Sequence, residues 1–350
     1  MKASIPRRLE QHTRVWEPGF RQHLVPGDGL RGATGPGNDL SRIGLSKNNL
    51  VEQALPAGDE WLKKRARLDL IMTDPAVPRL IDRHALRTHL SRAERQGSAP
   101  FLLDRVVEDF GERLAAVLRT FNSAADVGTP GPQLREVLSQ RVAAITRIDL
   151  LRQEDDRLGL APESLDLAVS ALALQAIDDL PGVLAQVRRA LKPDGLLLVA
   201  LFGGDTLTEL RQAFAAAESE VEGGLSPRVL PFGDLRELGA LLQRAGFALP
   251  VADVDRVVVR YDTAFALMQD LRRMGATNPL AERRRVPLRR TTLLRMAQIY
   301  SERFADPDGR VRATFDVVWL SGWAPHESQQ KPLKPGSAKA SLEAAVKRKG

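Results

Sequence analysis

An acidic residue followed by a glycine-containing turn is the stretch of this sequence best suited to chemistry. Residues 126–132 read DVGTPGP, follow a short run of small strand-compatible residues and precede a helical pattern that begins near Gln133. A strand, a glycine turn and a helix in this order let a ligand approach the backbone at the amino end of the helix. Pro130 and Pro132 lack amide donors, so this turn offers fewer contacts than a run of glycines. Two interpretations stay open: a ligand-binding turn, and a turn kept for folding alone.

A strand–helix–strand unit over residues 164–204 provides the frame for that turn. Residues 164–171 are apolar, compatible with a strand and too short for a typical helix. Residues 180–191 have apolar side chains at helical spacing, with Asp179 placed as the N-cap. Residues 195–204 are almost wholly apolar, as in a strand covered on both faces. The unit predicts a parallel sheet that binds ligands at the carboxyl ends of its strands.

The spacing before this unit limits the number of strands. Only 38 positions separate Gly128 from Asp166, whereas a βα unit needs roughly 20–30 residues. We therefore expect one helix and one strand there, the strand lying over 141–151 and reaching its carboxyl end at Asp149. Further helices are expected at 79–96, 99–121, 207–220, 233–247, 264–278 and 291–304, and further strands at 247–263 and 310–325. The last strand is expected to close a mainly parallel sheet with an antiparallel edge.

Composition excludes several classes of protein. The 350 residues are 43% hydrophobic, enough for a full core, and no run approaches the roughly 20 apolar residues of a membrane span. Peripheral association with a membrane stays open. The sequence has no Cys, which excludes disulfides, thiolate nucleophiles and Cys-based metal sites, and its five His are scattered, so no metal site is expected.

The net charge of +7 comes from the two ends of the chain. Residues 1–71 and 324–350 each have a net charge of +4, and residues 72–323 therefore have −1. A nucleic-acid partner is not expected of the central domain. Residues 1–71 show no periodic pattern and could be a disordered arm, an accessory region, an organellar presequence or translated sequence upstream of a true start at Met72, which is the favoured interpretation.

The second half of the chain resembles a known family. The segments that support the resemblance are LDLAVSALALQAIDDLPGVLAQVRRALKPDGLLLVALFGGDTLTELR (165–211), GGLSPRVLPF (223–232), AGFALPVADVDRVVVRYDTAFALMQDLRRMGATN (245–278) and ATFDVVWLSGWAP (313–325), with LIDRHALRTHLSRA (80–93) upstream. They resemble the respiratory complex I assembly factor 5 family within the class I S-adenosylmethionine (SAM) dependent methyltransferases. The family is also similar to the malonyl-carrier-protein methyltransferases of biotin synthesis.

The resemblance implies a three-layer, Rossmann-like α/β methyltransferase fold over residues 72–325, with N-terminal helices in 72–121 and a flexible basic tail over 326–350. It implies a protein that modifies or chaperones a protein partner, a complex I subunit, with methylation or hydroxylation as the chemistry. A small-molecule or carrier-protein O-methyltransferase and a catalytically silent binding factor are the alternatives. The Arg/Ala/Leu-rich composition suggests a bacterial, cytoplasmic member, peripheral at the inner membrane if it meets one.

The resemblance also assigns a SAM site. The cofactor-binding candidates are Asp126, Gly128 and Gly131 at the turn, Asp149 for the ribose hydroxyls, Asp155 and Asp156 on the adenine side, and Ser170 after the central strand. A solvated loop is the alternative for the acidic pair 155–156. Because the turn contains prolines where the family has glycines, weak or lost SAM binding is expected.

Substrate contacts are assigned to Gln175, Asp205 and Thr206, and the catalytic residue is not assigned. The alternative for Asp205 and Thr206 is that one of them caps the helix that follows. A further set, Arg272, Arg273 and Asn278, suits an anionic or protein substrate, although a solvated helix face is favoured there.

Overall fold

A single six-stranded sheet forms the centre of the described chain, which in this computed structural model covers residues 79–330. Its strands are β1 (Phe121–Val127), β2 (Val142–Ile148), β3 (Leu165–Ala171), β4 (Leu191–Phe202), β5 (Ala248–Tyr261) and β6 (Val311–Trp323), in the spatial order β2-β1-β3-β4-β6-β5. The first four strands are mutually parallel, and β6 is antiparallel to both β4 and β5. The predicted, mainly parallel sheet with an antiparallel edge is confirmed. At that edge β6 lies between β4 and β5, and β5 is the outermost strand.

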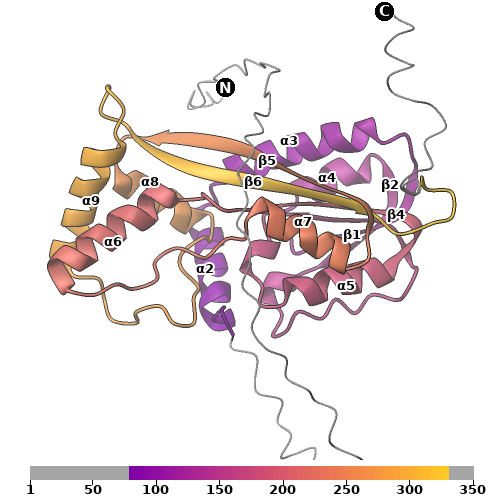
Figure 1. Cartoon of the computed structure of the whole chain (residues 1–350), viewed down its shortest axis with the longest axis horizontal. Helices are drawn as coiled ribbons and strands as arrows, with labels where there is room; N and C mark the ends of the chain where they lie inside the picture. Colours follow the sequence, from indigo (N-terminus) through magenta and orange to yellow (C-terminus); the bar gives the residue numbers. More distant parts are fainter. Residues whose placement is uncertain (1–78, 331–350) are drawn as a thin grey trace, which may run out of the picture. The chain divides into compact units, whose positions relative to one another are not determined.

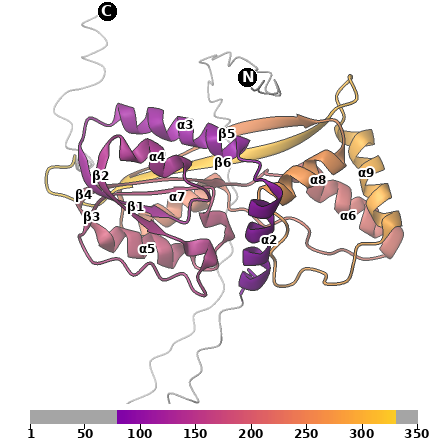
Figure 2. The ribbon, with the colours of Figure 1, turned by 180° about the vertical axis from the view of Figure 1, so that it is seen from behind.

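Helices cover both faces of this sheet. They are α2 (Arg83–Gln96), α3 (Phe101–Ala116), α4 (Gln133–Ser139), α5 (Leu180–Ala190), α6 (Thr208–Glu222), α7 (Leu235–Arg244), α8 (Ala264–Arg273) and α9 (Arg290–Phe304), with short 3₁₀ turns at 150–152 and 174–176. Figure 1 shows α3 and α4 on one face and α5 and α7 on the other, and Figure 2 shows the same layers from behind. The three-layer α/β fold is confirmed.

The two faces have separate hydrophobic cores. Strand residues 167, 169 and 171 of β3 pack with α3, α4, α6, α8 and α9 on one face, around Phe110 and Trp319. On the other face Ala168, and Leu165 ahead of the register shift at the start of β3, pack with α5 and α7. Because side chains of a strand alternate between faces, the almost continuous apolar runs of β3 and β4 supply both cores.

The central unit forms as its sequence predicts, with one shift. Asp179 caps α5 by accepting a hydrogen bond from the Gly182 amide (2.8 Å). β4 begins at Leu191, four residues earlier than expected, because Leu191 already pairs with Leu165 before a register shift. Only α4, β2 and a 3₁₀ turn lie between β1 and β3, so the expected single βα unit is confirmed.

The last two strands continue beyond the sheet as a two-stranded ribbon. Residues 317–323 of β6 pair with β4, whereas residues 311–316 pair only with β5 among the strands described. The backbone of the loop after β4 occupies the other side of β6: Gly203 N–H donates to Asp316 O (2.9 Å) and Leu207 N–H to Thr314 O (2.7 Å). Helices α6, α8 and α9 gather around the far end of this ribbon (Figure 1).

Several expectations concern residues beyond this part of the chain. Those for residues 1–71 and for most of the tail, 331–350, lie outside the described residues. Within residues 79–330, no helix has both the length and the apolar character needed to cross a bilayer.

Candidate functional site

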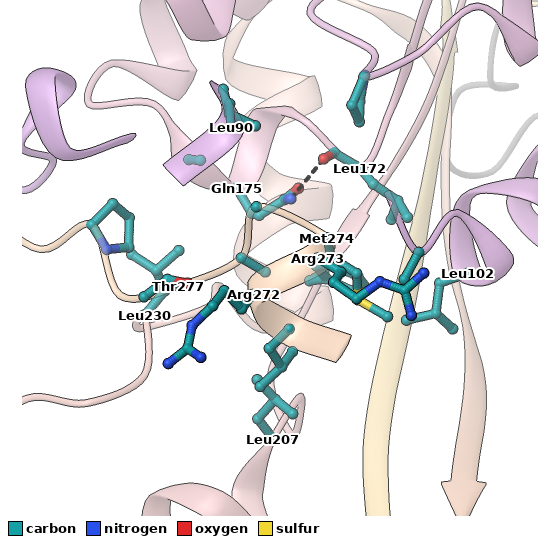
Figure 3. Close-up of a pocket in the computed structure, with 18 of the residues that line it drawn as sticks. Leu90, Leu102, Leu172, Gln175, Leu207, Leu230, Arg272, Arg273, Met274 and Thr277 are labelled. Carbon is teal, nitrogen blue, oxygen red and sulfur yellow. Dashed lines mark hydrogen bonds between the residues drawn. The ribbon is translucent and has the colours of Figure 1, made fainter. Parts of the chain in front are cut away.

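A cavity of about 630 Å³ opens at the carboxyl ends of the parallel strands (Figure 3). Its floor comes from the residues that follow β1, β3 and β4, namely Pro130, Leu172 and Thr206. Its walls come from α2, α3, α6 and α8 and from the loops 228–232 and 272–279. The volume lies within the roughly 300–1,000 Å³ of small-molecule sites, and the position is where open α/β sheets bind ligands.

Two glycines give the predicted turn its shape. Gly128 and Gly131 have φ of 80° and 78°, a left-handed conformation that side chains disfavour. A Cβ at Gly128 would lie 3.1 Å from the Cβ of Ala173 and 3.3 Å from that of Leu150, so the turn is packed against the ends of its neighbouring strands. Gly131 lines the cavity, whereas Gly128 lies beneath it.

Asp126, the acidic residue before the turn, is bonded to another residue of the fold. Asp126 is fully buried at the end of β1, and its Oδ2 accepts a hydrogen bond from Arg135 of α4 (2.8 Å). Burial raises the pKa of Asp126, and the neighbouring Thr129 and Arg135 oppose that rise. The carboxylate therefore fixes α4 against β1, and it does not reach the cavity.

The three other acidic candidates differ sharply in their surroundings. Asp149 follows β2 with its side chain 42% exposed, and only long contacts of 3.4 and 3.8 Å join it to Arg147 and Arg152. Asp155 is exposed and accepts from the Arg157 amide (3.1 Å).

Asp156, by contrast, has a side chain that is only 10% exposed and bonded within the fold. It forms an ion pair with Arg83 of α2, whose side chain is 4% exposed, and accepts hydrogen bonds from the amides of Asp178 (3.1 Å) and Asp179 (3.0 Å). It thereby joins α2 to the segment before α5. The alternative of a solvated loop applies to Asp155 and is wrong for Asp156.

The remaining predicted residues divide between structure and cavity. The Ser170 hydroxyl is buried and donates to Val127 O (2.6 Å), which ties β3 to β1. The Thr206 hydroxyl donates to Asp316 O (3.3 Å) and accepts from Asp316 N–H (3.0 Å), in the manner of a strand partner, yet the residue also lines the cavity. Asp205 accepts from Arg256 (2.5 Å) and is not among the described lining residues.

The expectation that Asp205 or Thr206 caps the next helix is wrong. Helix α6 begins after Leu207, whose φ is 56°, and no side chain caps it. The reason is that β6 and Arg256 engage both polar side chains before the helix starts.

Two side-chain amides leave oxygens free at the cavity. Gln175 donates to Leu172 O (2.8 Å) and Gln133 donates to Asp104 (3.2 Å), but the Oε1 atom of each is buried without a hydrogen-bond partner in residues 79–330. Both line the cavity. Gln175 is the predicted substrate contact. The sequence predicts Gln133 only as the start of a helix, and the signal for a role at the site is its position directly after the glycine turn.

The third set of candidates also reaches the cavity. Arg272, Arg273 and Asn278 all line it. Arg272 is at the same time exposed, which agrees with the solvated helix face that the sequence favours. In Figure 3 the side chains of Arg272 and Arg273 leave the end of α8 in different directions, that of Arg273 towards Leu102. Asn278 is structural, since its Nδ2 donates to Pro227 O (2.8 Å) and joins the two wall loops.

These residues fit SAM in part. The left-handed glycines, the free Gln133 and Gln175 oxygens and the volume suit the cofactor's methionine side. Asp149 has an exposed carboxylate after β2 but is not among the residues that line the cavity. Asp156 does not fit, because it is paired with the buried Arg83, and Asp126 pairs with Arg135 through Oδ2 while its Oδ1 is buried without a partner in the described residues. Among residues 79–330, no group of three His, Asp or Glu is placed to hold a metal ion.

Comparison with known proteins agrees with this architecture. Residues 95–250 match the family described as Methyltransferase domain. The chain is 36% identical over 293 residues to the human "Arginine-hydroxylase NDUFAF5, mitochondrial", covering 77% of this chain and 84% of that protein. The zebrafish protein of the same name is 38% identical over 260 residues, covering 69% and 81%. The chain belongs to the NDUFAF5 family. It spans 44% of the length of the longer Dictyostelium discoideum relative, at 43% identity over 55% of this chain.

The chain is also similar to proteins of a second family. The chain is 33% identical to "Malonyl-[acyl-carrier protein] O-methyltransferase" of Xylella fastidiosa, over 70% of this chain and 89% of that protein. Among solved structures, the YcgJ protein of Bacillus subtilis matches with 12% identity and a TM-score of 0.44, over 63% of this chain and 98% of that chain. The NDUFAF5 relatives are named as mitochondrial, which differs from the bacterial, cytoplasmic member suggested by composition.

Proposed function

We propose that this protein acts in the assembly of respiratory complex I by modifying or holding one of its subunits, as the family resemblance implies. The observation that supports an enzyme over a silent binding factor is the cavity itself. It is large, lies at the glycine turn, and has two buried amide oxygens that no group within residues 79–330 satisfies. Buried polar atoms are normally paired, so unpaired ones at a cavity favour a ligand.

SAM is the cofactor within this proposal, and it would supply the methyl group when bound. The backbone around Gly128 and Gly131 would hold its methionine part, and Asp149 would bind the ribose hydroxyls. With Asp126 and Asp156 engaged elsewhere, binding is expected to be weaker than micromolar. The walls would exclude water and position the acceptor, which is the main contribution of such a fold to transfer chemistry.

The cofactor proposal is tested by titrating S-adenosylhomocysteine and SAM into the full chain by calorimetry. Asp149→Asn should weaken the affinity by about tenfold, because a hydrogen bond to a charged group contributes about 1.5 kcal/mol or more. Asp155→Asn is the matched control, since its carboxylate is exposed, does not line the cavity and, within the described chain, is bonded to Arg157 two positions away; it should leave the affinity unchanged. Micromolar binding by the wild type would contradict the expected weak site.

The assembly role is tested by deleting the gene in its native host and measuring complex I activity. Loss of activity that returns with the wild-type gene supports the proposal, and normal activity overturns it. An intact-mass difference of one subunit between the two strains separates modification from holding.

A further inference from the structure

Two loops beside the cavity have a surplus of positive charge. Residues 223–232 follow α6, residues 279–290 lie between α8 and α9, and both loops contribute lining residues to the cavity. The side chain of Asn278 joins them by donating to Pro227 O (2.8 Å). We call these two loops the rim. Together they contain six arginines and one acidic residue, Glu282.

Three of the six arginines hold the rim to the fold. They form ion pairs with acidic residues outside the two loops: Arg228 with Glu218, Arg283 with Asp82, and Arg284 with Glu222. The side chains of Glu218 and Glu222 are only 1% and 7% exposed. Glu222 also accepts a hydrogen bond from the hydroxyl of the buried Thr292 in α9 (2.6 Å). The rim is therefore fixed in place, and the acids that fix it have their charge already balanced.

The other three arginines of the rim are exposed. The side chain of Arg285 is 74% exposed, and its ion pair with Asp82 is long, at 4.0 Å. Arg289 and Arg290 are exposed, and their side chains have no ion pair or hydrogen bond with another residue between 79 and 330. They stand at the start of α9, where no acid lies in the first turn and the helix dipole disfavours cations. Their charge does not stabilise the helix and is available to a partner.

Exposed apolar side chains accompany these cations. Leu225 is 69% exposed and Val286 is 56% exposed. Leu225 follows Glu222 by three residues and Val286 follows Arg284 by two, so the Glu222–Arg284 ion pair brings the two apolar side chains to the same part of the rim. A partner that covers this surface would gain from apolar groups as well as from negative charge.

The composition of the rim indicates which partner fits. Neither loop contains Trp or Tyr, the residues that anchor proteins at a membrane surface, and no exposed aromatic ring is present for stacking on bases. Every cation of the rim is an arginine, whose planar guanidinium forms two-pronged hydrogen bonds with carboxylates. The ends of this chain do not suit the rim, because residues 1–71 and 324–350 each have a net charge of +4.

We propose that the rim is a docking surface for an acidic segment of a protein partner, with apolar residues between its carboxylates. The inference rests on the proposed function only in taking this partner to be the protein that is modified or held. Docking beside the cavity would bring a neighbouring residue of the partner to the cavity mouth. The rim would thus select the partner by its surrounding sequence, independently of the chemistry inside the cavity.

The test titrates the full chain into a fluorescently labelled peptide of glutamate, leucine and serine and follows fluorescence anisotropy. The peptide should bind saturably, and a peptide with glutamine in place of glutamate should bind at least tenfold more weakly. The triple rim variant, Arg285→Gln with Arg289→Gln and Arg290→Gln, should weaken binding of the acidic peptide by about tenfold. Reversing the charge with Arg289→Glu and Arg290→Glu should create binding of a lysine peptide of the same length.

A second triple variant is the matched control. Arg189→Gln, Arg236→Gln and Arg244→Gln remove three exposed arginines of α5 and α7, none of which lines the cavity, and change the net charge by the same amount. The affinity for the acidic peptide should stay within about twofold of the wild type. Val286→Ser should weaken binding about threefold, and only for the peptide that contains leucine.

Three outcomes would overturn the inference. Equal weakening in the two triple variants would show an effect of net charge alone. Binding of phosphatidylglycerol vesicles or of a uridine oligonucleotide that is lost in the triple rim variant, while peptide affinity is unchanged, would assign the rim to a membrane or to RNA. A dimer of the wild type that dissociates in the triple rim variant would assign the rim to a second copy of the chain.

The rim and the proposed function fail separately. Circular dichroism of each variant establishes that it is folded. A normal complex I in the deletion strain overturns the assembly role and leaves the peptide titrations unaffected. Unchanged peptide affinity in the triple rim variant overturns the docking surface and leaves the assembly role unaffected.

Discussion

The two sides of the cavity differ in the polar groups that they leave unpaired. On the side of the glycine turn, Asp156 is bonded to the protein itself, and the unpaired groups include the buried amide oxygens of Gln133 and Gln175. On the side of α8, Arg273 is bonded to the protein, and the group without a partner in the described chain is the exposed side chain of Arg272. A buried polar group that is satisfied internally stabilises one arrangement of the fold, whereas an unsatisfied one is available to a ligand. Polar residues at a cofactor motif are therefore not all binding residues.

The largest effect on stability is expected from breaking the ion pair between Arg83 and Asp156. Arg83→Met should lower the free energy of unfolding by about 3 kcal/mol, because it leaves Asp156 buried without its cation. Arg87→Met, one turn along the same helix, removes an ion pair with the exposed Glu154 and should cost less than about 1 kcal/mol. Urea denaturation measures both. Equal losses would mean that the Arg83–Asp156 pair is no more than a surface contact.

A smaller effect is expected at the turn itself. Gly128→Ala should destabilise the protein by about 1–3 kcal/mol, since it forces a side chain into a left-handed conformation and crowds Ala173 and Leu150. Gly159→Ala imposes the same kind of conformation (φ 64°) where a Cβ meets open space. The difference between the two unfolding free energies isolates the crowding, and no difference would show that the turn is loosely packed.

The smallest effect concerns pH. Because burial raises the pKa of Asp126, the folded state holds this proton more tightly than the unfolded state does. The ordinary pKa of an aspartate is 3.8. The contribution of Asp126 to stability therefore falls as the pH rises from that value through the raised pKa of the folded state. Asp126→Asn lacks this change, so its stability relative to wild type should improve between pH 4 and pH 7. Urea denaturation at both pH values gives the comparison, and a pH-independent difference would contradict it.

The fold was predictable because local patterns and topology agree. The apolar runs that became β3 and β4, the helical spacing of α5 and its Asp179 cap each follow from neighbouring residues in the sequence. The 38 positions between Gly128 and Asp166 limited the number of strands by length alone. The order of β5 and β6 was harder to predict from the sequence. Which of the two strands pairs with β4 depends on contacts between residues that are far apart in the chain.

The site was predictable in place and less so in detail. The turn, Gln175 and Thr206 lie at or beneath the cavity, but the partners of Asp156 and Thr206 come from residues 73 and 110 positions away. Sequence spacing cannot show that Arg83 neutralises Asp156, or that the backbone of Asp316 in β6 is hydrogen-bonded to the Thr206 hydroxyl. The sequence names Arg272 as a candidate for an anionic or protein substrate but favours a solvated helix face, because local spacing does not show that a cavity lies beside the end of α8.

The ribbon formed by β5 and β6 has a consequence for how such a protein diversifies. Helices α6 and α8 line the cavity, and together with α9 they gather where β6 has left β4 and, among the described strands, pairs only with β5. Substitutions at the lining residues of α6 and α8 therefore change the shape and charge of the cavity wall without altering the pairing of the parallel strands. This part of the wall can vary in sequence independently of the parallel half of the sheet.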